Sequence, residues 1–163
     1  PDFASSTDNL AGALAHGGSF DHRVKYIGPL SRFIIHHPSS IINYSTYATI
    51  AILSGLEPQR TIFEQELVNR FRTSNQSLLI VRGKIGGPAT STHIGSVTLV
   101  PYLQDEELLY LMQAATTIIV RSGYSTIMDL AVLGLLGKAE FHPTPGQSEQ
   151  EYLAAKLIGK FNL

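Results

Sequence analysis

The chain has 163 residues, of which 44% are hydrophobic and 15% charged, and its formal net charge at pH 7 is −1. This length and composition predict a single folded domain with a substantial buried core, and they exclude intrinsic disorder. Because the charge is balanced and Lys and Arg are scattered, we expect no nucleic-acid partner. The absence of cysteine excludes disulfides, thiolate metal sites and a cysteine nucleophile, and no apolar run reaches the roughly eighteen residues of a membrane span.

The first part of the chain carries weak structural signals. Residues 1–23 are rich in Ser, Ala, Gly, Asp and His, which predicts a linker or a peripheral segment. Residues 24–163 are expected to form the domain itself. A short strand is expected at residues 24–27, and a loop at residues 31–45, where a Pro-Ser-Ser run interrupts any regular period.

The remainder of the chain alternates between buried strands and helices. In chain order we expect strand 46–53, helix 58–73, strand 78–81, loop 85–96, strand 97–100, helix 105–115, strand 117–120, a helix starting directly after the next turn, strand 139–142 and helix 149–160. Six strands alternating with helices, without a long hairpin signal, predict an α/β fold. It is a doubly wound, mostly parallel six-stranded Rossmann-like sheet with helices on both faces. Ligands of such sheets bind outside the carboxyl ends of the strands.

The most informative segment is the tight polar turn that joins strand 117–120 to the following helix. Free backbone N–H groups and the positive end of the helix dipole attract anions at such a corner. Asp129, one turn into the helix, offers a carboxylate that accepts two hydrogen bonds from a ribose diol. A structural alternative is a Thr-x-x-Asp cap formed by Thr126 and Asp129. The residues expected to hold a diphosphate at this corner are Ser122, Gly123, Tyr124 and Ser125.

A second corner follows about twenty residues later, at residues 143–147. Gln147 and Gln150 lie near a helix start, where each side-chain amide offers both a donor and an acceptor to sugar hydroxyls. Ser148 and Glu151 have the spacing of a capping box, so Glu151 also has a purely structural explanation.

Two further corners extend the predicted edge. Gly55 follows a buried strand and permits close approach of a ligand, and Arg60 is a candidate for neutralising phosphate, although a solvated helix residue is an equal alternative. Tyr102 and Leu103 end another strand and are candidates for flanking a nucleobase, or are simply core. None of these corners is a dinucleotide fingerprint or a P-loop. No His and carboxylate cluster has ligand spacing, so no metal is expected.

Taken together, these corners resemble the carboxy-terminal, donor-binding domain of two-domain (GT-B) glycosyltransferases. Within this group, the chain is similar to the peptidoglycan N-acetylglucosaminyltransferase family, which uses UDP-N-acetylglucosamine. The carboxy-terminal domain of that family is of the glycosyltransferase family 28 type. The likeness spans roughly residues 24–160. The carrying motifs are VRSGYSTIMDLAVLG and PTPGQSEQEYLA, supported in the same order by YIGPLSRF, ILSGLEPQR and TLVPYLQDEEL.

The resemblance implies a role for several positions. Asp129 falls where the family has a ribose-binding Glu, and residues 122–125 match the diphosphate-facing turn. Leu103 matches the residue whose backbone reads uracil. Gln150 and Glu151 fall where the family has a Gln-Gln pair near the donor sugar, and the Glu departs from that pattern.

The resemblance also implies partners and a reaction. A parent protein would add an amino-terminal acceptor-binding domain that contributes the catalytic groups, so this chain alone would bind a nucleotide sugar, with UDP as the expected nucleotide, without transferring it. A bacterial cytoplasmic enzyme is expected, with a peripheral association of the parent with the inner face of the membrane left open. No cofactor is implied. A nucleotide-sugar epimerase of the same architecture and a non-catalytic nucleotide-sugar-binding module remain alternatives.

Overall fold

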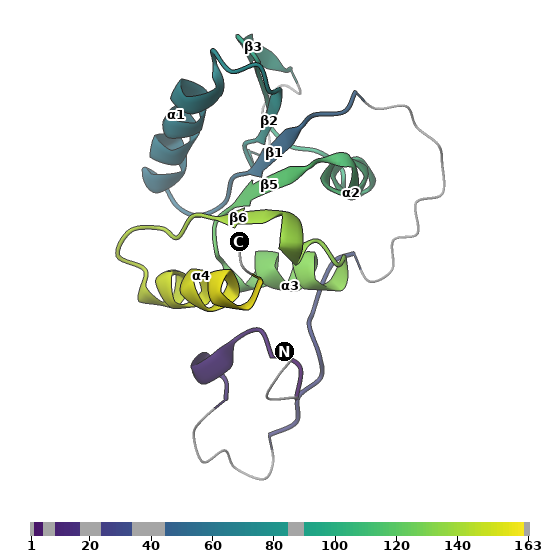
Figure 1. Ribbon diagram of the computed structural model, residues 1–163, viewed down its shortest axis with the longest axis vertical. Helices are drawn as coiled ribbons and strands as arrows, with labels where there is room; N and C mark the ends of the chain where they lie inside the picture. Colours follow the sequence, from purple (N-terminus) through teal and green to yellow (C-terminus); the bar gives the residue numbers. More distant parts are fainter. Residues whose placement is uncertain (1, 5–8, 17–23, 34–44, 85–89, 162–163) are drawn as a thin grey trace.

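The computed structural model describes residues 2–4, 9–16, 24–33, 45–84 and 90–161. They build a six-stranded sheet in the order β3-β4-β2-β1-β5-β6 (Figure 1). The strands are β1 (Thr49–Ile52), β2 (Leu78–Val81), β3 (Thr92–Ile94), β4 (Val97–Val100), β5 (Thr117–Val120) and β6 (Ala139–Phe141). The α-helices are α1 (Gln59–Phe71), α2 (Asp105–Ala114), α3 (Tyr124–Val132) and α4 (Ser148–Phe161), with short 3-10 turns η1 (Gly12–Leu14) and η2 (Leu136–Lys138).

The sheet reverses its winding at the central strand. β1 pairs in parallel with β2 on one side and with β5 on the other, and β4 and β6 extend the two sides in parallel. The chain moves outward from β1 to β2 and β4, and then returns through α2 to β5 and β6. The gap between the carboxyl ends of β1 and β5 is therefore the topological switch point, where ligands of doubly wound sheets bind.

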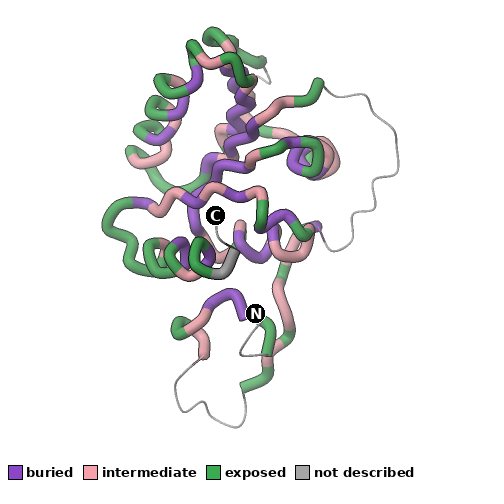
Figure 2. Tube along the Cα trace, in the orientation of Figure 1, coloured by how far each residue is buried: buried purple, intermediate pink, exposed green. Residues whose placement is uncertain are grey.

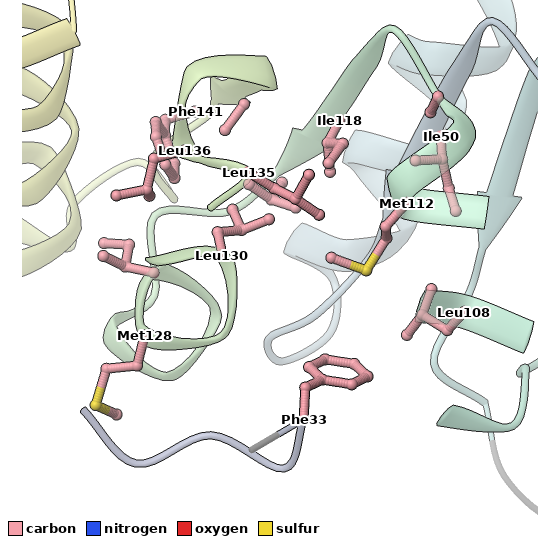
Figure 3. Packing of buried hydrophobic residues seen from close by; sticks show 14 of the residues in the cluster. Phe33, Ile50, Leu108, Met112, Ile118, Met128, Leu130, Leu135, Leu136 and Phe141 are labelled. Carbon is pink, nitrogen blue, oxygen red and sulfur yellow. The ribbon is translucent and has the colours of Figure 1, made fainter. Parts of the chain in front are cut away.

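Helices cover both faces of the sheet, as the alternation of the strand residues requires. Ala51, Ile80 and Ile119 pack against the apolar side of α1 in one buried cluster. Ile50 and Ile118 point to the opposite face, where α2, α3 and α4 close a larger cluster (Figure 3). The predicted fold class, a doubly wound and mostly parallel sheet of six strands, is confirmed.

Two details of the predicted strand set are wrong. Residues 24–27 form no strand, and Val24 and Ile27 are 49% and 63% exposed, so their apolar side chains find no sheet to join. The sixth strand is instead β3, which pairs antiparallel with β4 inside the segment expected to be loop. Gly95 turns this hairpin with a φ of +59°. All three residues of β3 are exposed, so the strand leaves no hydrophobic alternation in the sequence.

The amino-terminal segment packs against the domain beside α4 (Figure 2). The Asp2 carboxylate is 1% exposed and accepts hydrogen bonds from the backbone N–H groups of Phe3, Leu10 and Ala11, at 2.8, 2.8 and 3.0 Å. Burial acts to raise the pKa of Asp2, but these bonds and one from His16 outweigh it, so the pKa lies below its usual value. Residues 9–16 are thereby held in a compact turn.

Three hydrogen bonds tie this turn to α4. Lys156 Nζ donates to the backbone and side-chain oxygens of Asn9 at 2.8 and 2.6 Å. The Tyr152 hydroxyl accepts a hydrogen bond from the Ala13 N–H at 2.8 Å. The segment therefore forms a wall beside the amino-terminal ends of α3 and α4, which matters for the site below.

Candidate functional site

The candidate site lies at the edge of the sheet where the parallel strands end. β1 runs into the Ser54-Gly55 turn, β5 into the turn at residues 121–123, and β6 into the loop at residues 142–147. Because β1, β5 and β6 are parallel neighbours, these three loops meet at one edge. The sequence predicted this convergence from the alternation of strands and helices and from the turns that follow the strands.

Hydrogen bonds join two of these loops directly. Arg121 Nη1 donates to the carbonyl oxygens of His142 and Pro143 at 3.2 and 2.9 Å. Ser122 Oγ donates to the carbonyl oxygen of Gln150 at 2.7 Å. The structure thus brings together the two corners that carry the functional prediction. Ser122 is fully buried and its side chain is turned toward α4, so it orders the turn, and its contact with a ligand stays a prediction.

The glycines of all three loops face open space. A Cβ built on Gly55, Gly123 or Gly146 would meet no heavy atom within 4 Å. Gly123 is also the N-cap residue of α3, with an extended backbone (φ −71°, ψ 140°) and no side-chain cap. Because the first N–H groups of an α-helix have no partner within the helix, the start of α3 is suited to an anion.

Arg121 contributes a buried positive charge that the sequence analysis did not single out. It is 6% exposed, and its guanidinium lies 4.0 Å from the centroid of the Phe63 ring. Nη2 donates to the carbonyl oxygen of Gln59, the first residue of α1, at 3.3 Å. Burial lowers the pKa of Arg121, but an arginine remains protonated in proteins. One side chain therefore links the loops after β1, β5 and β6.

Asp129 is engaged by a segment that is remote in sequence. Ser31 Oγ donates to Asp129 Oδ1 at 2.6 Å, and Arg32 Nε lies 3.6 Å from Asp129 Oδ2. Arg32 Nη1 also contacts Asp105 Oδ1, at the start of α2, at 2.9 Å. The carboxylate is thus held in a fixed orientation between α2 and α3. Ser31 and Arg32 belong to the YIGPLSRF motif, but no local pattern links them to Asp129.

The polar residues of the second corner contact one another and the loop. Gln150 Oε1 accepts the Thr144 N–H at 2.9 Å, and Gln150 Nε2 donates to Gln147 Oε1 at 2.6 Å. Glu151 Oε1 accepts the Gly146 N–H at 3.3 Å. Gln147, Gln150 and Glu151 therefore order the loop before α4, and their contact with a sugar stays a prediction.

The remaining predicted site residues spread along the same edge. Arg60 pairs with Glu57 Oε1 through Nε and Nη2 at 3.1 and 2.9 Å, and this pair is at the surface. Hydrogen bonding from Thr61, followed by that from Arg60, lowers the pKa of Glu57 to about 2. Tyr102 is 36% exposed, whereas Leu103 packs against the core on the α2 face. The roles of Gly55, Tyr124 and Ser125 in binding a ligand likewise stay predictions.

The described part of the chain offers neither a metal cluster nor a membrane-spanning helix. No group of three or more His, Asp or Glu side chains there is arranged to hold a metal ion. Within the same ranges, every helix is too short or too polar to cross a bilayer. The adjacent histidines His36 and His37 lie outside the described residues.

Comparison with known proteins adds a distant likeness. No protein-family model and no curated protein matches the chain. Among solved structures, it is similar to the glycosyltransferase SnogD from Streptomyces nogalater, with 12% sequence identity and a TM-score of 0.40. The match covers 87% of this chain and 48% of the SnogD chain, so this chain spans about half of that protein's length. At this level of similarity the geometry of the sheet edge, and not the likeness, carries the functional conclusion.

Proposed function

We propose that this chain binds a nucleoside-diphosphate sugar at the carboxyl edge of its sheet and is the donor-binding half of a glycosyltransferase. The supporting observation is the convergence of three loops at the switch point, where Gly55, Gly123 and Gly146 all border open space. The uncapped start of α3 and the buried charge of Arg121 each contribute positive charge beside this place.

A diphosphate suits this place better than an uncharged ligand does. Glycines permit backbone N–H groups to approach phosphate oxygens, and a helix start adds a favourable dipole. Arg121 is too buried to leave its carbonyl partners, so its contribution is a fixed positive field and not a direct contact. Asp129 is oriented by Ser31 and paired with Arg32, and each carboxylate oxygen keeps a further lone pair for a ribose diol.

The reaction of a parent enzyme would be displacement at the anomeric carbon, with the nucleoside diphosphate as leaving group. Hydrogen-bond donors that already point at the leaving diphosphate stabilise the negative charge that develops on it. An acceptor-binding domain would supply the groups that act on the acceptor hydroxyl. We therefore expect the isolated chain to bind the donor without turnover.

Calorimetry with uridine, UDP and UDP-glucose tests the proposal. UDP should bind the wild-type chain and uridine should bind at least about tenfold more weakly, because the diphosphate makes the main contacts. Gly123→Val places two methyl groups in the space beside the α3 start and should weaken UDP binding. Gly137→Val is the matched control, because Gly137 also borders open space but lies in η2, before β6 and away from the carboxyl edge. Equal UDP affinity in both variants would overturn the proposed site.

A further inference from the structure

A hollow of about 330 Å³ lies between the amino-terminal segment and the first residues of α3 and α4. Its walls come from three parts of the chain that are distant in sequence. The lining residues are Ala11, Leu14, Ala15, Tyr124 and Glu149.

The amino-terminal wall of this hollow is firmly held. Burial, followed by the charge of Asp2 and a hydrogen bond between the Tyr124 hydroxyl and the Asp2 carboxylate, raises the pKa of Tyr124 above its usual value. Asp2 in turn fixes the backbone of Leu10 and Ala11. Two of the lining residues, Ala11 and Tyr124, are therefore held together through Asp2.

The hollow adjoins both loops of the proposed diphosphate site. Tyr124 directly follows Gly123, the N-cap residue of α3. Glu149 is the second residue of α4 and lies three positions after Gly146. A group attached to a diphosphate held by these loops would lie within reach of the hollow.

The chemistry of the walls favours a neutral, hydroxylated ring. Ala11, Leu14 and Ala15 form an apolar side, and Tyr124 adds an aromatic one. Glu149 supplies a carboxylate, which accepts hydrogen bonds from hydroxyls but repels phosphate. Among the described residues, no Lys or Arg lines the hollow. Its volume lies at the small end of the range for ligand pockets, which favours a single ring over an oligosaccharide.

We propose that this hollow receives the monosaccharide of the bound nucleotide sugar, with Glu149 as hydrogen-bond acceptor for its hydroxyls and residues 11–15 as its apolar wall. This inference rests on the proposed function. It makes the amino-terminal segment a part of the donor site. Glu149 and Leu14 would then help to determine which sugar is bound, together with the residues of the loop before α4.

The test compares UDP with UDP-glucose and UDP-N-acetylglucosamine by calorimetry on the full 163-residue chain. At least one of the two UDP-sugars should bind the wild-type chain more tightly than UDP does. Glu149→Ala should weaken that UDP-sugar about tenfold and leave UDP unchanged, since a hydrogen bond to a charged group is lost only for the sugar. Leu14→Trp, which fills the hollow from a 51% exposed position, should do the same. Gln65→Ala, at an exposed position of α1, is the control and should leave the binding of both ligands unchanged.

The outcomes separate this inference from the proposed function. Suppose that UDP binds, but that neither UDP-sugar binds more tightly than UDP, or that neither variant changes the affinity for the UDP-sugar. The sugar pocket is then overturned, while the diphosphate site stands. If Glu149→Ala weakens UDP and the UDP-sugar equally, the pocket is also overturned. If UDP does not bind the wild-type chain at all, the proposed function fails and this inference fails with it.

Discussion

Ser31 Oγ donates a 2.6 Å hydrogen bond to Asp129 Oδ1, although 98 residues separate the two side chains. The contact connects the segment before the sheet with α3, and it fixes the carboxylate proposed to bind ribose. A carboxylate oriented in advance loses less conformational freedom when a ligand binds. Asp129 is thus held in place by a residue that need not touch the ligand.

This relationship leads to a prediction about the ribose. Asp129→Asn should weaken UDP binding about tenfold, since a hydrogen bond to a charged acceptor is replaced by a weaker one. Ser31→Ala should weaken it less, because the carboxylate remains and only its orientation is freed. Calorimetry with 2′-deoxy-UDP provides the check: the deoxy ligand should bind the wild-type chain more weakly than UDP, and Asp129→Asn should narrow the difference. An Asp129→Asn variant with unchanged UDP affinity would remove Asp129 from the site.

Arg121 leads to a prediction about stability. Arg121→Met removes the donor from the carbonyl oxygens of Gln59, His142 and Pro143, and should lower the free energy of unfolding by roughly 3 kcal/mol. Urea denaturation measures this change. Arg72→Met, at an exposed position just after α1, is the control and should change stability little. Similar losses in both variants would contradict the bridging role of Arg121.

Much of the fold follows from local signals in the sequence. The buried strand β5, the glycine turn after it and the apolar side of α3 are all visible as patterns over a few residues. The convergence of the loops then follows from the rules for parallel sheets. The candidate diphosphate corner could therefore be located without coordinates.

What the sequence did not reveal depends on tertiary contacts. β3 is short and fully exposed, so its pairing with β4 leaves no periodic signature. Residues 24–27 have strand-like composition, but composition alone cannot supply a neighbouring strand. The contacts of Asp129 with Ser31 and of Asp2 with Tyr124 join positions far apart in the chain, where spacing rules carry no information.

The Asp2 cluster leads to a prediction about pH. A carboxyl group whose pKa is lower in the folded state stabilises the fold above its unfolded pKa, and this contribution is lost as the pH falls through the lower, folded value. The amino-terminal segment should therefore stay docked above the usual Asp pKa of 3.8 and detach as the pH falls below it. Hydrogen exchange at the Leu10 and Ala11 amides measures the change. In Asp2→Asn the same amides should exchange faster at neutral pH, with no further transition in this range, and exchange unaffected by the substitution would contradict the role of Asp2.

The β3–β4 hairpin depends on Gly95 for two separable reasons. Gly95 has a φ of +59°, which costs about 1 kcal/mol for a residue with a side chain, and its Cβ would also collide with the carbonyl oxygen of Arg72. Gly134 has a similar φ of +68°, but a Cβ there would meet open space. Gly134→Ala should thus lower the free energy of unfolding by about 1 kcal/mol, and Gly95→Ala by at least about 2 kcal/mol, because the hairpin must also move away from the end of α1. Urea denaturation of the two variants measures the difference. Equal losses would mean that backbone conformation alone, and not close packing of the hairpin on Arg72, requires glycine at position 95.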